Sequence, residues 1–253
     1  MQKQRIMILG GSGFIGQNFV RSFVQNPQYD IHAVHFKREA PQIDGVTWHN
    51  LDLRNPDEIR GLFRRGDVVI QAAATTSGSK DIIGRPYIHV TDNAVMNSYL
   101  LREIFEAEIK HFIFFSCTVM YQSSVRPLLE TDFDANEPLV DRYVGVGNTK
   151  IYIEKMCEFF SSISDVKFSV LRHSNIYGPY DKFDFERSHF LGANISKVMK
   201  AEKIIQVWGD GKEKRDVLHI NDLIDMVQLI LKEQKNPYSL YNCGSGVAIE
   251  VGE

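Results

Sequence analysis

A glycine-rich motif near the start of the chain places the strongest constraint on what the sequence can fold into. The motif reads Gly10-Gly11-Ser12-Gly13-Phe14-Ile15-Gly16 and lies between a predicted strand, residues 5–9, and a predicted helix, residues 14–25. Its regularly spaced glycines allow a tight turn, close approach of a pyrophosphate to the backbone, and close packing of helix on strand. The helix N-terminus adds N–H donors and the positive end of a dipole. The motif therefore predicts a dinucleotide site formed by Gly10, Ser12, Gly13, Phe14, Ile15 and Gly16.

Composition and charge narrow the class of protein. The chain has 253 residues, 43% hydrophobic and 24% charged, which is enough to bury a sizeable core. A net charge of -3 argues against a nucleic-acid partner. No apolar stretch approaches the ~20 residues needed to span a bilayer, and the first strand begins within a few residues of Met1, which leaves no room for a secretory signal. We therefore expect a cytoplasmic protein.

Apolar β-rich runs alternate with amphipathic helical patterns along most of the chain. Alternation of this kind predicts an α/β fold, with a Rossmann-type, doubly wound parallel sheet and right-handed crossovers. The predicted strands are residues 5–9, 30–36, 67–72, 111–116 and 167–171, and the predicted helices are residues 14–25, 56–63, 95–108 and 149–161.

The character of the sequence changes after Tyr177, where loops become rich in Gly, Asp and charged residues. We place a dinucleotide-binding domain at residues 1–175. A smaller substrate-binding subregion, interleaved with the last sheet elements, follows at residues 176–253.

The end of the second strand bears on which dinucleotide binds. Proteins that prefer NAD generally carry an acidic residue there, which accepts hydrogen bonds from the adenosine ribose. This chain instead reads His35-Phe36-Lys37-Arg38. Because Lys37 and Arg38 could surround a ribose phosphate and no carboxylate is present, the segment favours NADP, with NAD as the alternative.

Several further segments carry a resemblance to a known family. They include Tyr143-Val144-Gly145-Val146-Gly147-Asn148-Thr149-Lys150, Leu171-Arg172-His173-Ser174-Asn175-Ile176-Tyr177-Gly178-Pro179 and Arg215-Asp216-Val217-Leu218-His219. With the glycine motif, they make the chain resemble the extended short-chain dehydrogenase/reductase family, in its nucleotide-sugar epimerase/dehydratase group. Residues 180–189 are particularly similar to the GDP-fucose synthase branch of that family. The last residues, 244–253, resemble a turn and strand that precede further substrate-binding structure in the family, so we expect a truncated substrate subregion.

The resemblance implies roles for individual residues. Asp52, with Leu53, matches an adenine-contacting aspartate, and the run Ala72-Ala73-Ala74 matches small residues that let a strand end approach the cofactor. Lys150 would bind the nicotinamide ribose, and His173 would lie beside the cofactor. A diphosphate excluded from water needs charge-assisted donors, which suits Arg215. The implied substrate-binding residues are Asn175, Lys197, Trp208 and Arg215, and no metal site is expected.

Two departures from the family pattern concern catalysis. Val146 occupies the position of the catalytic tyrosine, whose phenol beside a lysine can exchange a proton as hydride moves. Cys117 stands where a serine or threonine hydroxyl is usual, and a thiol is a poorer hydrogen-bond donor. The neighbouring Ser116 or Thr118 could supply that hydroxyl after a small change of register. Three residues could replace the lost acid: His189, which matches a catalytic acid of the GDP-fucose synthase branch, Tyr143 before the helix, and Cys117 itself.

Two functions remain open. The first is an NADP-dependent nucleotide-sugar epimerase or keto-sugar reductase that transfers hydride with an atypical proton donor. In the family two helices pair with their copies, so the resemblance also implies a homodimer. The second is a non-catalytic module that binds the dinucleotide and senses redox state or scaffolds a complex. Val146 and Cys117 favour the module, and the elaborated segment 175–219 favours the enzyme.

Overall fold

A parallel sheet forms the centre of the molecule. The computed structural model describes residues 3–75, 85–124, 126–182, 190–201 and 210–252. Within these residues, a seven-stranded sheet runs in the order β3-β2-β1-β4-β5-β6-β9, and each neighbouring pair is parallel. The strands are β1 (Gln4–Leu9), β2 (Tyr29–His35), β3 (Val46–Asn50), β4 (Val68–Gln71), β5 (His111–Cys117), β6 (Lys167–His173) and β9 (Tyr238–Cys243).

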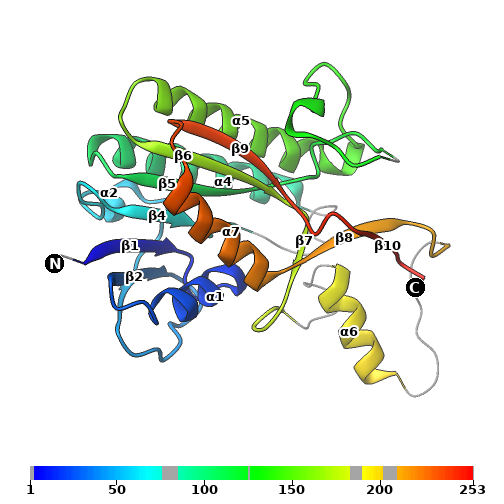
Figure 1. Ribbon diagram of the computed structural model, residues 1–253, viewed down its shortest axis with the longest axis horizontal. Coiled ribbons are helices and arrows are strands. Elements are labelled where there is room, and N and C mark those ends of the chain that lie inside the picture. The colour runs from blue at the N-terminus through cyan, green and yellow to red at the C-terminus, as the bar shows by residue number, and fades with distance from the viewer. Residues whose placement is uncertain (1–2, 76–84, 125, 183–189, 202–209, 253) are drawn as a thin grey trace.

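Helices cover both faces of this sheet (Figure 1). One face carries α1 (Phe14–Phe23) and α7 (Ile220–Glu233), and the other carries α2 (Pro56–Ile59), α4 (Pro86–Glu106) and α5 (Val144–Ser162). Side chains of β1 alternate between the two cores, with Ile8 facing α1 and α7 and Leu9 facing α4 and α5. A strand that is buried on both faces reads as a continuous apolar run, which is why β1, β2, β4, β5 and β6 were predicted from the sequence. The strands β3 and β9, most of whose residues are only half-buried or exposed, were not among the predicted strands.

The order of strands confirms the predicted Rossmann-type, doubly wound parallel sheet. Connections run outward from β1 to β2 and β3 in one direction, and then from β4 to β5 and β6 in the other. The order therefore reverses between β1 and β4, which in open α/β sheets is where ligands bind.

A second, small sheet lies beside the carboxyl edge of the first. It contains β7 (Asn175–Tyr177), β8 (Lys214–His219) and β10 (Ala248–Glu250), with β8 parallel to β7 and antiparallel to β10. The helix α6 (Phe190–Lys200) lies next to β7 (Figure 1). After β8 the chain returns to the central sheet through α7 and β9. The proposed division at residue 175 stays a prediction.

Two helices begin earlier than their sequence patterns indicate. Helix α4 starts at Pro86 rather than at residue 95, because a proline is compatible with the first helical turn, where no N–H partner is needed. Helix α5 starts at Val144 rather than at residue 149. Its early glycines weaken helix propensity but allow close packing, since a Cβ on Gly147 would lie 2.8 Å from Leu139 Cδ1.

His111, the first residue of β5, is buried in a short polar chain. Its Nε2 lies 2.7 Å from Ser169 Oγ, and that hydroxyl donates to Gln234 Oε1. Burial lowers the pKa of His111 to about 4, and the nearby Lys167 and Lys110 add to the shift. The imidazole is therefore neutral in the folded protein at neutral pH.

We predict that His111 makes the protein less stable in mild acid. Between pH ~6.5 and about 4 the unfolded chain binds a proton at this imidazole and the folded chain does not, so the free energy of unfolding falls as the pH falls, by up to ~3 kcal/mol. Urea denaturation at pH 7.5, 6 and 5 measures this slope. His111→Gln should flatten this slope, because glutamine does not titrate in this range. Equal slopes in wild type and His111→Gln would contradict the prediction.

Candidate functional site

The residues predicted to bind a dinucleotide come together at the carboxyl edge of the central sheet. Because all strands are parallel, the segments that follow them meet at this one edge, which includes the reversal point between β1 and β4. The residues that the structure places at or just beyond the strand ends are Gly10 (β1), Lys37 and Arg38 (β2), Asp52 and Leu53 (β3), Ala72, Ala73 and Ala74 (β4), Cys117 (β5) and His173 (β6).

The glycine turn is closed by backbone contacts that leave no room for side chains. Gly10 has φ +75°, and a Cβ there would lie 2.7 Å from the Cα of Ala73. A Cβ on Gly16 would lie 2.2 Å from the carbonyl oxygen of Gly10. The N–H of Gly11 donates to Val34 O at 2.8 Å, which fixes the turn to β2. The first-turn N–H groups of α1 have no partners within the helix, which suits them to an anion.

The adenosine end of the predicted site contains cations and one paired carboxylate. Arg54 donates to both oxygens of Asp52, at 2.9 and 2.7 Å, and also to Asp92 at 2.8 Å. The hydrogen bonds from Arg54 hold the pKa of Asp52 below its usual range. Lys37 and Arg38 are exposed to solvent. Arg54 was assigned no role from the sequence. The ion pair between Arg54 and Asp52 could have been predicted, because the two residues are only two positions apart in the sequence.

Helix α5 brings Lys150 to the end of β5. The Nζ of Lys150 donates to Phe115 O at 2.7 Å and lies 4.6 Å from the centroid of the Phe114 ring. Burial lowers the pKa of Lys150, while Cys117 and Glu154 act in the opposite direction. Val146 is half-buried one helical turn before Lys150, ~6 Å along the axis. The position of the missing phenol therefore lies on the same helix as the lysine.

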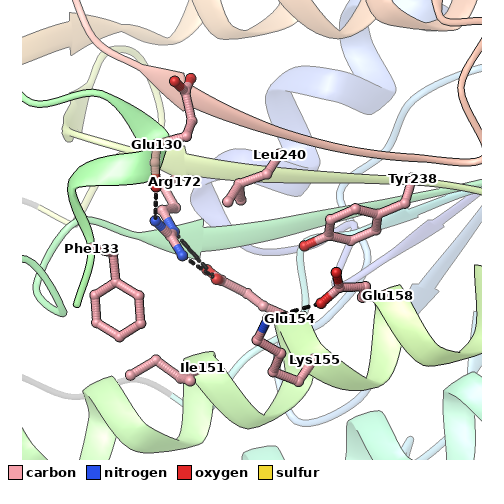
Figure 2. Close-up of a pocket in the computed structure, with 9 residues that line it drawn as sticks. All are labelled: Glu130, Phe133, Ile151, Glu154, Lys155, Glu158, Arg172, Tyr238 and Leu240. Carbon is pink, nitrogen blue, oxygen red and sulfur yellow. Dashed lines mark hydrogen bonds and ion pairs between the residues drawn. The ribbon is translucent and has the colours of Figure 1, made fainter. Parts of the chain in front are cut away.

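A buried ion pair lies one turn beyond Lys150. Glu154 and Arg172 are each 4% exposed, with Nη2 and Oε2 2.7 Å apart, and Figure 2 shows the carboxylate turned toward the guanidinium. Ser116 also donates to Glu154, so its hydroxyl is engaged in this network. The pair borders a cavity of about 210 Å³, none of whose lining residues was assigned a role from sequence: Glu130, Phe133, Ile151, Glu154, Lys155, Glu158, Arg172, Tyr238 and Leu240.

The residues considered as replacement acids lie in different surroundings. Burial raises the pKa of the Cys117 thiol, and Lys150 and the N–H of Val119 oppose that shift, so the group is a thiol near neutral pH. Tyr143 directly precedes α5, and the helix continues through Val144–Ser162, which puts it ~10.5 Å along the axis from Lys150. His189 lies outside the described residues.

The predicted sugar-binding residues lie on the small sheet and on α6. Asn175 on β7 donates to Asp216 O at 3.0 Å, which joins β7 to β8. Arg215 on β8 donates to Glu213 at 2.6 Å, while its Nε is shielded from solvent and has no hydrogen-bond partner among the described residues. Lys197 lies in the last turn of α6. Trp208 is outside the described part of the chain.

Comparison with curated proteins finds sugar-nucleotide enzymes over nearly the whole chain. GDP-L-fucose synthase of Azorhizobium caulinodans is 28% identical over 257 aligned residues, which cover 99% of this chain and 78% of that protein. The dTDP-4-dehydro-6-deoxy-D-allose reductase of Streptomyces bikiniensis is 24% identical, covering 92% of this chain and 74% of that protein. Both relatives align with most of the chain rather than with the glycine motif alone.

Comparison with solved structures and with a family model agrees with the fold. UDP-glucose 4-epimerase of Thermotoga maritima, solved with UDP-glucose, superposes with a TM-score of 0.84 at 23% identity, covering 98% of this chain and 79% of that one. Along the part of the chain that the structure describes, no helix has the length and apolar character needed to cross a membrane. The model of the NAD dependent epimerase/dehydratase family matches residues 6–244. The chain therefore belongs to the NAD dependent epimerase/dehydratase family.

Proposed function

We propose that the protein is an NADP-dependent nucleotide-sugar epimerase or keto-sugar reductase that acts by hydride transfer. The observation that carries this proposal is the glycine turn, where Gly10 and Gly16 leave no space for side chains at the reversal point of the sheet. Membership of the epimerase/dehydratase family supports the reaction class. The named activities of the relatives, GDP-L-fucose synthase and a dTDP-keto-sugar reductase, support the substrate class.

The proposed cofactor fits the groups at the carboxyl edge. The pyrophosphate would lie on the N-terminus of α1, over the glycine turn, and Lys150 would bind the nicotinamide ribose through N–H groups that its single bond to Phe115 leaves over. Lys37 and Arg38 would contact a 2′-phosphate. The bound nicotinamide would supply the site for hydride. Side chains of the protein would bind the substrate and transfer the proton.

The proposed substrate is a nucleotide-diphosphate sugar. Arg215 supports this assignment, because its buried Nε has no hydrogen-bond partner among the described residues, and a diphosphate oxygen would provide one. Asn175 and Lys197 lie on the neighbouring β7 and α6. We propose that these residues and Trp208 bind the substrate.

The proton donor in this proposal is not the usual tyrosine. Val146 cannot transfer a proton, and the unbroken helix keeps Tyr143 two turns from Lys150. The raised pKa of Cys117 makes its thiol a weak acid. We therefore keep His189 as the leading donor, because an imidazole is the side chain whose ordinary pKa lies nearest to neutral pH.

The assembly proposed is a homodimer through α4 and α5. These helices pack side by side and expose Val95, Tyr152 and Phe159, which are 37%, 43% and 50% exposed. Large exposed apolar groups on neighbouring helices are typical of an interface. Light scattering of the purified protein would measure the mass. The expected cytoplasmic location stays a prediction.

A second function, a non-catalytic module that binds the dinucleotide as a redox sensor or scaffold, is favoured by one specific observation. Val146 and Cys117 replace two proton-handling groups at once, while Lys150, which can serve binding alone, is kept. The two functions differ in whether a sugar nucleotide binds.

One prediction of the proposed function concerns dinucleotide binding. Calorimetry should find tighter binding of NADPH than of NADH, and the double change Lys37→Ala/Arg38→Ala should weaken NADPH by roughly 10- to 100-fold and NADH by less than about 3-fold, because charge-assisted bonds to the 2′-phosphate are lost. The matched control is Lys232→Ala/Lys235→Ala, which removes two lysines at the end of α7 and in the loop after it and should leave both affinities unchanged. Equal losses for both dinucleotides would refute the phosphate contact.

The same titration decides between the two functions. A panel of GDP-, dTDP-, UDP- and CDP-sugars is added to the dinucleotide complex. Binding or oxidation of NADPH by one of them supports the enzyme. A dinucleotide complex that takes up no sugar nucleotide supports the sensor or scaffold.

Another prediction of the proposed function concerns the proton donor. His189→Asn should lower kcat by about 10²- to 10⁴-fold while the Kd of NADPH stays unchanged, because the loss is confined to proton transfer. Adding Val146→Tyr should recover part of the rate, since residue 146 lies one turn before Lys150 on a continuous helix. Steady-state kinetics on the substrate found above measures both. Full activity in His189→Asn would exclude this donor, and Cys117→Ala and Tyr143→Phe would then be compared.

A further inference from the structure

An exposed aromatic side chain lies at the adenosine end of the proposed dinucleotide site. Phe36 directly follows β2 and is 44% exposed, whereas Phe19, Phe112 and Phe168 in the core are fully buried. It follows the strand whose Val34 O accepts the N–H of Gly11 in the glycine turn. Phe36 therefore follows the strand that is hydrogen-bonded to the glycine turn, and its side chain does not belong to either hydrophobic core.

Two cations lie over this ring. Lys37 Nζ and Arg54 Cζ are each 5.9 Å from its centroid. Lys37 follows it in sequence and is exposed, but Arg54 is fixed in place by its ion pairs to Asp52 and Asp92, at 2.7 and 2.8 Å. The segments after β2 and β3 thus present an exposed aromatic ring with two cations within cation–π distance of it.

The carboxylate that could read the edge of an adenine is already engaged. Asp52 accepts three hydrogen bonds from Arg54: from the backbone N–H at 3.0 Å, from Nε at 2.9 Å and from Nη2 at 2.7 Å. An adenine amino group would have to share oxygens that already accept from Arg54, so a contact with the ring face of the base would add to what this carboxylate can supply.

We infer that Phe36 is the platform on which the adenine of the bound dinucleotide stacks. The inference deepens the proposed function and rests on it. A base presents a π-face whatever its edge groups are, so stacking is suited to a site where Arg54 already engages both Asp52 and Asp92. Lys37 and Arg54 would stabilise the phosphate of the same nucleotide. Phe36, rather than an acidic residue, then determines affinity at the end of β2.

The test compares Phe36→Leu, which keeps apolar volume and removes the π-face, with Phe36→Trp, which keeps the face. Calorimetry measures the Kd of NADPH and of adenosine 2′,5′-bisphosphate, which contains the base without the nicotinamide. Phe36→Leu should weaken both by the same factor, roughly 5- to 100-fold, and Phe36→Trp should bind within about 3-fold of wild type. Phe159→Leu, at a phenylalanine that is 50% exposed on α5 and belongs to the proposed dimer contact rather than to the dinucleotide site, controls for the loss of an exposed ring and should not change either Kd.

A base analogue separates stacking from edge recognition. The hypoxanthine analogue of NADPH lacks the amino group, so wild type should bind it within about 3-fold of NADPH if stacking dominates. The inference is overturned if Phe36→Leu, with an unchanged melting temperature, binds NADPH as wild type does. The inference also fails if wild type binds the hypoxanthine analogue more than about 10-fold more weakly than NADPH while Phe36→Leu leaves the Kd of NADPH unchanged. Hydrogen bonds to the edge of the base would then determine its affinity. Wild-type protein that binds no dinucleotide would overturn the proposed function together with this inference.

Discussion

The position of α5 depends on the buried pair between Glu154 and Arg172. Both side chains are almost fully excluded from water, so removing either one would leave an unpaired charge, at a cost of ~3–5 kcal/mol. That is a large part of the ~5–15 kcal/mol by which a domain is stable. Because Glu154 lies one turn after Lys150, the same pair fixes both the rotation of the helix and its height against β5 and β6. The bond from Lys150 to Phe115 O is a consequence of that placement.

The glycine turn is the second structural feature that shapes the carboxyl edge of the sheet. It depends on the absence of side chains rather than on a favourable contact. Gly10 and Gly16 approach neighbouring backbone so closely that any Cβ would overlap it. Between this turn and Lys150 lie the ends of β4 and β5, which the parallel register holds side by side. Under the proposed function, a dinucleotide would extend along this edge from the glycine turn toward Lys150.

The sequence predicts what depends on local patterns and misses what depends on the packing of distant segments. The sheet and the glycine turn follow from apolar runs and from glycine spacing, and both are confirmed. The pairing of Glu154 with Arg172 forms only when α5 packs on β6, although the spacing of Glu154 from Lys150 was visible. The exposure of Phe36 has no sequence signal, since an aromatic residue after a strand usually reads as core. His189 and Trp208 stay predictions.

The Nε of Arg215, which is buried and has no hydrogen-bond partner among the described residues, is a feature that the proposed function can account for. A buried donor without a partner costs ~1–3 kcal/mol, and a ligand that supplies the acceptor removes that cost. Arg215 lies on β8 of the small sheet, whereas the glycine turn follows β1 of the central sheet. Under the proposed function, a diphosphate bound at the small sheet would supply the acceptor, and a hydride carrier beside a second ligand is the arrangement that a reductase or epimerase requires.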